Sequence, residues 1–266
     1  MRKRSTVIII ITIILSSVCF ISCNDKLPKS YETDLRKYYG DFQGCFVLYD
    51  FNNRYYIRYN NEQASKRLSP CSTFKIPNSL IGLETEVITD ENFMLKWDST
   101  KYYIDSWNMD HTLKTAISNS VVWYYQEIAR RVGEERMKAY INKIGYGNND
   151  ISGGIDKFWL MNSLKISANE QVEFLKKLYT DSLPFAKRNI DIVKNIIILE
   201  KNSKYTFSGK TGSGTSENRS QGWFIGTVLL GDNLYVFAVN IEAEKGADGK
   251  KAKEIAIEIL KNLKIL

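Results

Sequence analysis

The sequence predicts an α/β protein of the α+β type. One antiparallel sheet is built from both ends of the chain, helices flank it, and an all-helical domain is inserted in the middle. Strand-like runs gather near both ends, whereas the helical period of about 3.6 residues dominates the middle. The 266 residues are 44% hydrophobic and 25% charged, which is enough for a sizeable core. We expect residues 24–73 and 203–266 to form the sheet domain and residues 74–202 the helical domain, with a cleft between them.

The N-terminus has the pattern of a secretory signal peptide over residues 1–22. Basic residues at positions 2–4 precede an apolar run from 7 to 15, and small residues follow. This run is short for a membrane span, which needs about 20 apolar residues, so an uncleaved anchor is the weaker alternative. We therefore expect an exported, periplasmic protein. The residues Phe20-Ile21-Ser22-Cys23 also have the outline of a lipoprotein cleavage site, so both a free form and a lipid anchor at Cys23 stay open.

The charge of the chain points away from a nucleic-acid partner. The formal charge of +7 includes three positive residues of the signal segment, so the mature chain carries +4. The densest basic cluster, residues 245–253, is expected to be a solvated face. We expect a monomer or a homodimer.

Two of the four cysteines, Cys45 and Cys71, belong to the mature fold. A disulfide between them is one alternative in an exported protein. We favour the simpler interpretation, in which both are small buried thiols, one in a strand and one beside a candidate nucleophile.

The expected elements follow the chain in the order strands, helices, strands, helix. Two strands at 45–50 and 54–59 flank an Asn52-Asn53 turn. The turn at 231–233 joins the last two strands as a hairpin. The remaining expected elements are helices at 121–131, 134–144 and 168–179, strands at 204–210, 222–230 and 234–241, and a last helix at about 250–264.

The motif Ser72-Thr73-Phe74-Lys75 brings a hydroxyl and an amine together. If Ser72 opens a helix, Lys75 follows one turn later over the same face. The backbone N–H of Ser72 then lies at a helix N-terminus, where negative charge is favoured, and supplies half of an oxyanion hole. Alone, this spacing is also typical of a helix cap followed by a surface lysine.

A second motif, Lys210-Thr211-Gly212, follows an expected strand. On a strand edge it offers a fixed cation, a hydroxyl and, at Gly212, room for a substrate. Alone, it equally describes a strand that ends in a turn glycine. Together, Ser-x-x-Lys and Lys-Thr-Gly are the signature of serine β-lactamases and penicillin-binding proteins.

The segment between these motifs resembles the class D β-lactamases, the oxacillinase family. Ser120-Val121-Val122 stands where related families usually carry Ser-x-Asn, and Tyr146-Gly147-Asn148 and Phe158-Trp159-Leu160 follow in the order of the family. The resemblance covers nearly the whole mature chain. It implies a serine β-lactamase and penicillin-binding-protein-like fold, and hydrolysis of penicillin-type antibiotics through an acyl-enzyme on Ser72.

The resemblance also implies that Lys75 reacts with carbon dioxide to form N6-carboxylysine, the general base for acylation and deacylation. A lysine buried among apolar neighbours has a lowered pKa, so its neutral amine can attack carbon dioxide. Val122 and Trp159 are expected to support the carbamate, the latter by donating its indole N–H. Carbon dioxide or bicarbonate is then the only requirement, with no other cofactor.

The remaining roles are carried over from the family residue by residue. Ser120 relays a proton to the leaving nitrogen and Lys210 tunes that step. The oxyanion hole is formed by the backbone N–H groups of Ser72 and Ser213. Thr211 and Gly212 contribute to substrate binding.

The chain departs from the family at the site that binds the substrate carboxylate. No arginine stands near the start of the last helix, which leaves Lys251, Lys253 and Arg219 as candidates. Lysine lacks the bidentate geometry of arginine. Ser213-Gly214 after Lys-Thr-Gly and Met161-Asn162 after Phe-Trp-Leu are further departures, and they leave the substrate preference open.

His111 is the only histidine, which argues against a histidine-based triad and against zinc chemistry. We expect it at the surface or near a helix cap, and we expect no metal. Two other functions stay open: a penicillin-binding or β-lactam-sensing protein that is acylated without turnover, and a non-catalytic envelope lipoprotein.

Overall fold

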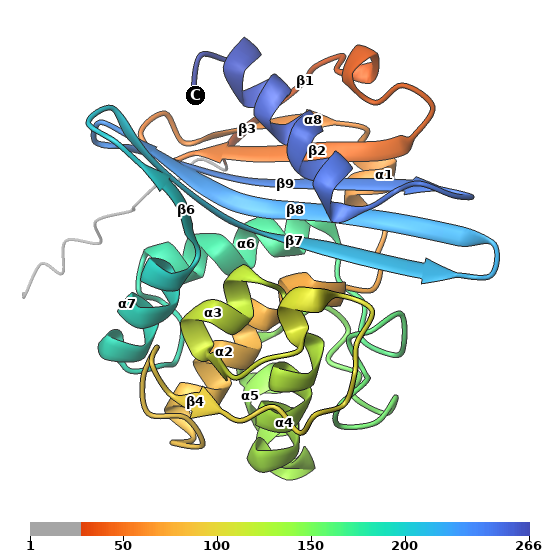
Figure 1. Ribbon diagram of the computed structural model, residues 1–266. Helices are drawn as coiled ribbons and strands as arrows, with labels where there is room; N and C mark the ends of the chain where they lie inside the picture. Colours follow the sequence, from red (N-terminus) through yellow and green to blue (C-terminus); the bar gives the residue numbers. More distant parts are fainter. Residues whose placement is uncertain (1–27) are drawn as a thin grey trace, which may run out of the picture.

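The computed structural model describes residues 28–266 and contains one seven-stranded sheet in the order β1-β3-β2-β9-β8-β7-β6. Helix α8 covers one face of the sheet, and the remaining large helices lie on the other face (Figure 1). The strands are β1 (Lys29–Glu32), β2 (Gln43–Asp50), β3 (Tyr55–Tyr59), β6 (Ile198–Lys201), β7 (Tyr205–Ser216), β8 (Arg219–Leu230) and β9 (Asn233–Ala243).

The helices come mostly from the middle of the chain, as the hydrophobic periodicity predicts. They are α1 (Asn61–Ser65), α2 (Lys75–Glu84), α3 (Leu113–Ser118), α4 (Val122–Val132), α5 (Glu134–Ile144), α6 (Ala168–Tyr179), α7 (Lys187–Ile196) and α8 (Gly249–Asn262). Three short 3₁₀ helices, η1 (Arg36–Tyr38), η2 (Cys71–Phe74) and η3 (Asp105–Trp107), and a two-stranded ladder of β4 (Met94–Leu95) with β5 (His111–Thr112) complete the described part.

The fold class is confirmed, with one exception to its antiparallel pairing. Strand β1 runs parallel to β3, whereas β2, β3 and β6 to β9 pair antiparallel. β7 also continues past the predicted strand end, through the Lys-Thr-Gly motif to Ser216. Strand β6 lies within the range predicted to be helical, and it adds a strand to the edge of the sheet beside β7.

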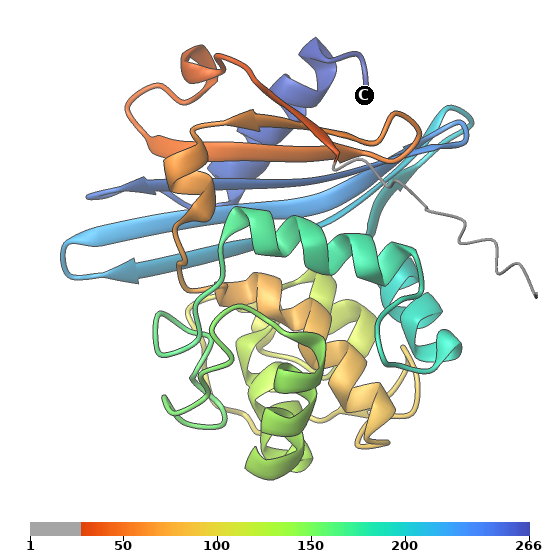
Figure 2. The ribbon, with the colours of Figure 1, turned by 180° about the vertical axis from the view of Figure 1, so that it is seen from behind.

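Two hydrophobic cores lie on the two faces of the sheet. One fills the space between the sheet, α8 and η1, and the other lies between the sheet and the helices. Helix α6 packs directly against the sheet (Figure 2). Helix α2 runs through the second core with every residue from Lys75 to Leu83 buried, as expected for a helix surrounded by protein.

The predicted signal peptide and the predicted lipidation site at Cys23 lie outside the described residues. Cys45 and Cys71 are both free and buried, which confirms the simpler interpretation of the cysteines. None of the helices formed by residues 28–266 is both long and apolar enough to cross a bilayer.

Candidate active site

Ser72 and Lys75 lie at the junction of η2 and α2, below the sheet. Ser72 belongs to η2, and Lys75 is the first residue of α2. The Nζ atom of Lys75 donates to the Oγ atom of Ser72 over 2.9 Å. Ser72 is half-buried, whereas Lys75 is fully buried. The Ser-x-x-Lys motif therefore forms a contact between an accessible hydroxyl and an amine shielded from water.

The surroundings of Lys75 favour its neutral form. Burial lowers the pKa of Lys75 well below its usual value, and the positive charge of Lys210 lowers it further. The ring of Tyr125 lies 5.3 Å from Nζ, and no carboxylate forms an ion pair with Lys75 anywhere in residues 28–266. An amine in this state is a nucleophile as well as a base.

Trp159 presents a buried donor without an acceptor. Its side chain is fully buried, and its Nε1 atom has no hydrogen-bond partner within the described part of the chain. Its ring stacks on Phe74, the neighbour of Lys75, with 5.4 Å between centroids. Buried polar groups are normally satisfied, so the unpaired N–H indicates a place for an acceptor. Val122, the first residue of α4, packs against the same core.

Ser120 and Lys210 form a second hydrogen-bonded pair. Ser120 occupies the turn between α3 and α4 with a left-handed backbone, at φ of 55°. Nζ of Lys210 donates to Oγ of Ser120 and to the carbonyl of Thr211, over 3.0 Å each. Burial, and to a lesser degree the charge of Lys253, lower the pKa of Lys210 to about 7.

The Lys-Thr-Gly strand approaches the nucleophile closely at Gly212. A Cβ atom on Gly212 would lie 2.9 Å from the carbonyl oxygen of Pro70 and 3.3 Å from the backbone nitrogen of Ser72. Glycine is therefore required for β7 to lie against the η2 turn. The next residue, Ser213, accepts a hydrogen bond on Oγ from the backbone N–H of Gly249, over 2.9 Å.

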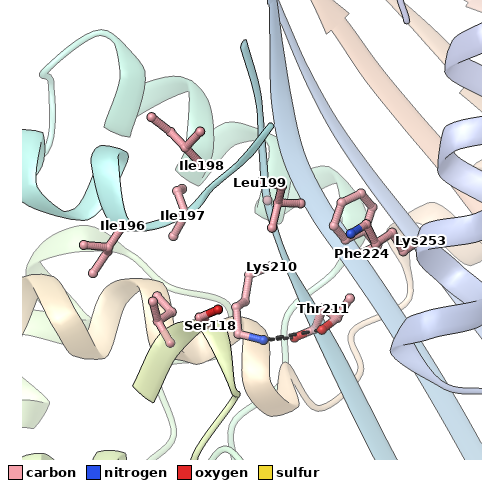
Figure 3. Close-up of a pocket in the computed structure, with 11 residues that line it drawn as sticks. Ser118, Ile196, Ile197, Ile198, Leu199, Lys210, Thr211, Phe224 and Lys253 are labelled. Atoms are coloured by element: carbon pink, nitrogen blue, oxygen red, sulfur yellow. Dashed lines mark hydrogen bonds between the residues drawn. The ribbon is translucent and has the colours of Figure 1, made fainter. Parts of the chain in front are cut away.

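The structure separates the three candidates for binding a substrate carboxylate. Lys253 lines a pocket together with Lys210 and Thr211 (Figure 3). Exposed Lys251 forms an ion pair with Glu254, over 2.7 Å, and is absent from that lining. Arg219 pairs with buried Glu242 and lines a different pocket.

The turn before Ser72 is strained and held by residues that the sequence analysis did not identify. Cys71 has a positive φ of 49°, a backbone conformation that a non-glycine residue rarely adopts. The Nε2 atom of Gln221 donates to the carbonyl of Ser69 over 2.6 Å and to the Sγ atom of Cys71 over 3.3 Å. Nε1 of Trp223 donates to the same carbonyl over 2.9 Å. Such strain persists only where the surroundings enforce it.

The backbone of Trp159 also belongs to this turn. Its carbonyl accepts from the N–H of Cys71 (3.0 Å) and from the hydroxyl of Ser69 (2.9 Å). The hydroxyl of Ser69 accepts in turn from the N–H of Met161 over 2.9 Å. A Cβ atom on Gly214 would lie 2.3 Å from Sδ of Met161, so the two departures from the family pack against each other.

The Tyr-Gly-Asn motif holds the loop that carries Trp159. Asn148 accepts from the N–H of Lys165 and donates to the carbonyl of Ser163, over 2.9 Å each. Gly147 has φ of 61°, and a Cβ atom there would lie 2.0 Å from the carbonyl oxygen of Lys165.

Tyr146 connects this loop to the nucleophile turn through a buried polar chain. Its hydroxyl donates to Oε1 of Gln171 over 3.2 Å, and Nε2 of Gln171 donates to Oγ1 of Thr73 over 2.9 Å. The sequence does not single out Gln171, because nothing in its local pattern distinguishes it from a core residue of an amphipathic helix.

His111 corrects one expectation. It is buried and not at the surface, and its ring contacts the carbonyl of Ser106 (2.8 Å) and Oγ1 of Thr115 (3.1 Å). The second expectation, a position near a helix cap, is confirmed, because His111 directly precedes Thr112, the N-cap of α3. Within residues 28–266, no three His, Cys, Asp or Glu side chains gather in a way that would hold a metal ion.

Known proteins match this arrangement over most of the chain. The family model of the penicillin binding protein transpeptidase domain matches residues 34–261. A Bacillus subtilis protein named "Probable beta-lactamase YbxI" is 45% identical over 221 residues, which are 83% of this chain and 81% of that protein. The solved class D β-lactamase BAT-2 is 42% identical, with a TM-score of 0.83 over 88% of this chain and 97% of that one.

A solved receptor domain is equally similar in structure. The C-terminal domain of the Bacillus licheniformis BlaR penicillin-receptor has a TM-score of 0.86 and 38% identity, over 90% of this chain and 98% of that domain.

Proposed function

Because the chain belongs to the class D β-lactamases, within the penicillin-binding protein transpeptidase family, we propose that it hydrolyses the β-lactam ring of penicillin-type antibiotics through an acyl-enzyme on Ser72. The observation that carries this proposal is the contact between the half-buried hydroxyl of Ser72 and the fully buried amine of Lys75, over 2.9 Å.

We further propose that Lys75 is N-carboxylated in the active enzyme. The lowered pKa of Lys75 supports this step, because the neutral amine forms the N–C bond to carbon dioxide and releases one proton. The unpaired indole N–H of Trp159 is a donor for the new carboxylate. The carbamate is a negatively charged base, whereas the unmodified amine at the same position is neutral.

In the first half-reaction, Ser72 loses its hydroxyl proton to modified Lys75 and its Oγ attacks the lactam carbonyl. The backbone N–H groups of Ser72 and Ser213 stabilise the oxyanion. The C–N bond then breaks, and the proton that Lys75 took from Ser72 is relayed to the leaving nitrogen through Ser120, which is hydrogen-bonded to Lys210. The carbamate is then free to act as a base again. In the second half-reaction it takes a proton from water, whose oxygen attacks the ester, and it returns this proton to Oγ of Ser72 as the ester C–O bond breaks.

We propose that Lys253 binds the substrate carboxylate in place of the arginine that the family usually carries near the start of the last helix. It shares a pocket with Lys210 and Thr211, whereas Lys251 and Arg219 are each paired with a glutamate. A substrate carboxylate at Lys210, Thr211 and Lys253 would reduce the repulsion between the two lysine ammonium groups.

The proposed function is tested by measuring penicillin turnover by the purified wild-type protein and by the variant Lys75→Ala. Lys75→Ala should abolish hydrolysis, because the base for both half-reactions is removed. Near-normal turnover by this variant would refute the mechanism. A chelator should leave the wild-type rate unchanged, and inhibition would reveal a metal requirement.

A receptor that is acylated and stays acylated is the second candidate, and the likeness to the BlaR receptor domain favours it. The two functions differ in deacylation. A receptor gives a burst equal to the amount of protein, whereas an enzyme continues at a steady rate. Mass spectrometry of Ser72 after the burst separates them. A protein that neither binds nor turns over a β-lactam would instead be the non-catalytic lipoprotein.

We also propose that the mature protein is exported, because residues 1–22 have the signal pattern. Intact-mass measurement of the protein from cells would distinguish cleavage before Cys23 with lipidation from cleavage without it. The expected partners are β-lactam molecules.

A further inference from the structure

A pocket of about 160 Å³ opens beside Lys210 and Thr211, at the part of the β7 edge that β6 leaves uncovered (Figure 3). The pairing of β6 with β7 ends at Ser208, and the last bond between the two segments runs from the N–H of Gly209 to the carbonyl of Ile197, over 2.9 Å. The pocket therefore adjoins the Lys-Thr-Gly motif on the side away from Gly212.

About half of the wall of this pocket is apolar. Ile196 and Ile197 are buried behind it, and the ring of Phe224 lines it from β8. Leu199 is 45% exposed and sits at a β-bulge, where the register of β6 shifts. Bulges redirect side chains, and here the bulge residue lines the pocket that opens beside the catalytic strand.

Two cations lie in the same pocket without a counter-ion. Nζ of Lys210 donates hydrogen bonds to Ser120 and Thr211. Nζ of Lys253 lies 5.9 Å from the ring centroid of Phe224. Neither lysine has an acidic partner in the part of the chain that the structure describes. Two lysine side chains without an acidic partner, next to an apolar stretch of wall, fit an anion that carries an apolar group next to its negative charge.

We infer that this pocket is a specificity subsite for the apolar group that a β-lactam carries on the ring carbon beside its carboxylate. The inference rests on the proposed function, because the carboxylate must first bind at Lys210, Thr211 and Lys253. The adjacent ring carbon then lies at the mouth of the pocket. An apolar cavity of about 150 Å³ holds one benzene molecule, and the carboxylate occupies part of this pocket, so the apolar groups that fit are smaller than benzene.

The test uses two cephalosporins, cefadroxil and cefprozil, which share one acylamino side chain. They carry methyl and propenyl, respectively, on the carbon beside the carboxylate. Burying two more carbons favours cefprozil in kcat/KM by up to about 15-fold. Leu199→Gln should reduce this preference at least about threefold, because a polar group replaces part of the apolar wall. Leu229→Gln is the matched control, since Leu229 is a 42% exposed leucine on β8 outside the pocket.

The outcomes separate the subsite from the proposed function. Equal kcat/KM for both cephalosporins in the wild type, or equal preferences in the two leucine variants, would overturn the subsite while penicillin turnover continued. Failure of the wild type to form an acyl-enzyme with any β-lactam would overturn the proposed function itself. If the cephalosporins acylate Ser72 and are released slowly, the same ratio is measured from the second-order rate constants of acylation.

Discussion

Replacement of Trp159 by phenylalanine tests the carbamate while an aromatic ring is kept at this position. In the wild type the Trp159 ring stacks on Phe74, with 5.4 Å between centroids. The variant removes the indole N–H that has no partner in residues 28–266, together with part of the ring system. A hydrogen bond to a charged group contributes about 1.5–3 kcal/mol. The affinity of Lys75 for carbon dioxide should therefore fall about 10- to 150-fold.

The assay follows penicillin turnover while bicarbonate is titrated, together with the ¹³C signal of carboxylated lysine. Trp159→Phe should be slow without added bicarbonate and recover at high concentrations, with its midpoint displaced by that factor. Trp123→Phe is the control, because the Trp123 indole donates to the carbonyl of Trp107, outside the site. Equal bicarbonate midpoints for wild type and Trp159→Phe would refute the assigned role.

Three further predictions concern charges and contacts around the site. Burial lowers the pKa of Lys210 in the folded protein to about 7. Below pH 7 Lys210 is therefore protonated in both the folded and the unfolded state. Above pH 7 the folded protein loses this proton, whereas the unfolded chain keeps it. The free energy of unfolding should therefore rise between pH 7 and about 8.5, by up to about 1.4 kcal/mol per pH unit from this group, and Lys210→Met should flatten the rise in urea titrations. Lys253→Met should raise the pKa of Lys210 and increase KM about tenfold by removing about 1.4 kcal/mol of carboxylate binding. Lys251→Met, which removes a lysine paired with Glu254, should change neither, and an equal effect of both would contradict the assignment. Gln221→Leu should slow acylation about 5- to 10-fold, since a hydrogen bond of about 1–1.5 kcal/mol is lost from the nucleophile turn. The ¹³C carbamate signal should stay unchanged in this variant, and its loss would show general disruption of the site instead of misplacement of Ser72.

The sequence predicts the elements that carry strong periodicity and misses those that do not. Helices α5 and α6 have the predicted bounds, because their apolar residues repeat with the helical period between clear caps. β1 consists of four exposed residues at the sheet edge, so it has no alternation of polar and apolar side chains to detect. β6 follows directly on the apolar end of α7, and its bulge interrupts the alternation that would identify a strand.

For the site, the sequence identifies the residues that belong to recognisable motifs. It misses residues such as Gln221, whose side chains hydrogen-bond to backbone carbonyls. The structure brings Ser72 to Lys75 and Ser120 to Lys210, pairs that the motifs suggest. Gln221 binds the carbonyl of Ser69, 152 positions away, and a carbonyl has no sequence signature. The choice between Lys251 and Lys253 required the orientation of α8, because residues two positions apart on a helix face different directions.

The loop held by Tyr146–Asn148 has a consequence for how the site would respond to heat. It contains no regular helix or strand between Gly147 and Lys165, but its Trp159 side chain is fully buried, and the carbonyl of Trp159 accepts from Cys71 and Ser69 of the nucleophile turn. The loop and the turn therefore share their hydrogen bonds, and opening of either one on warming would break the same contacts. The indole and the Ser72 hydroxyl would be displaced together, so that loss of activity would coincide with exposure of the buried tryptophan.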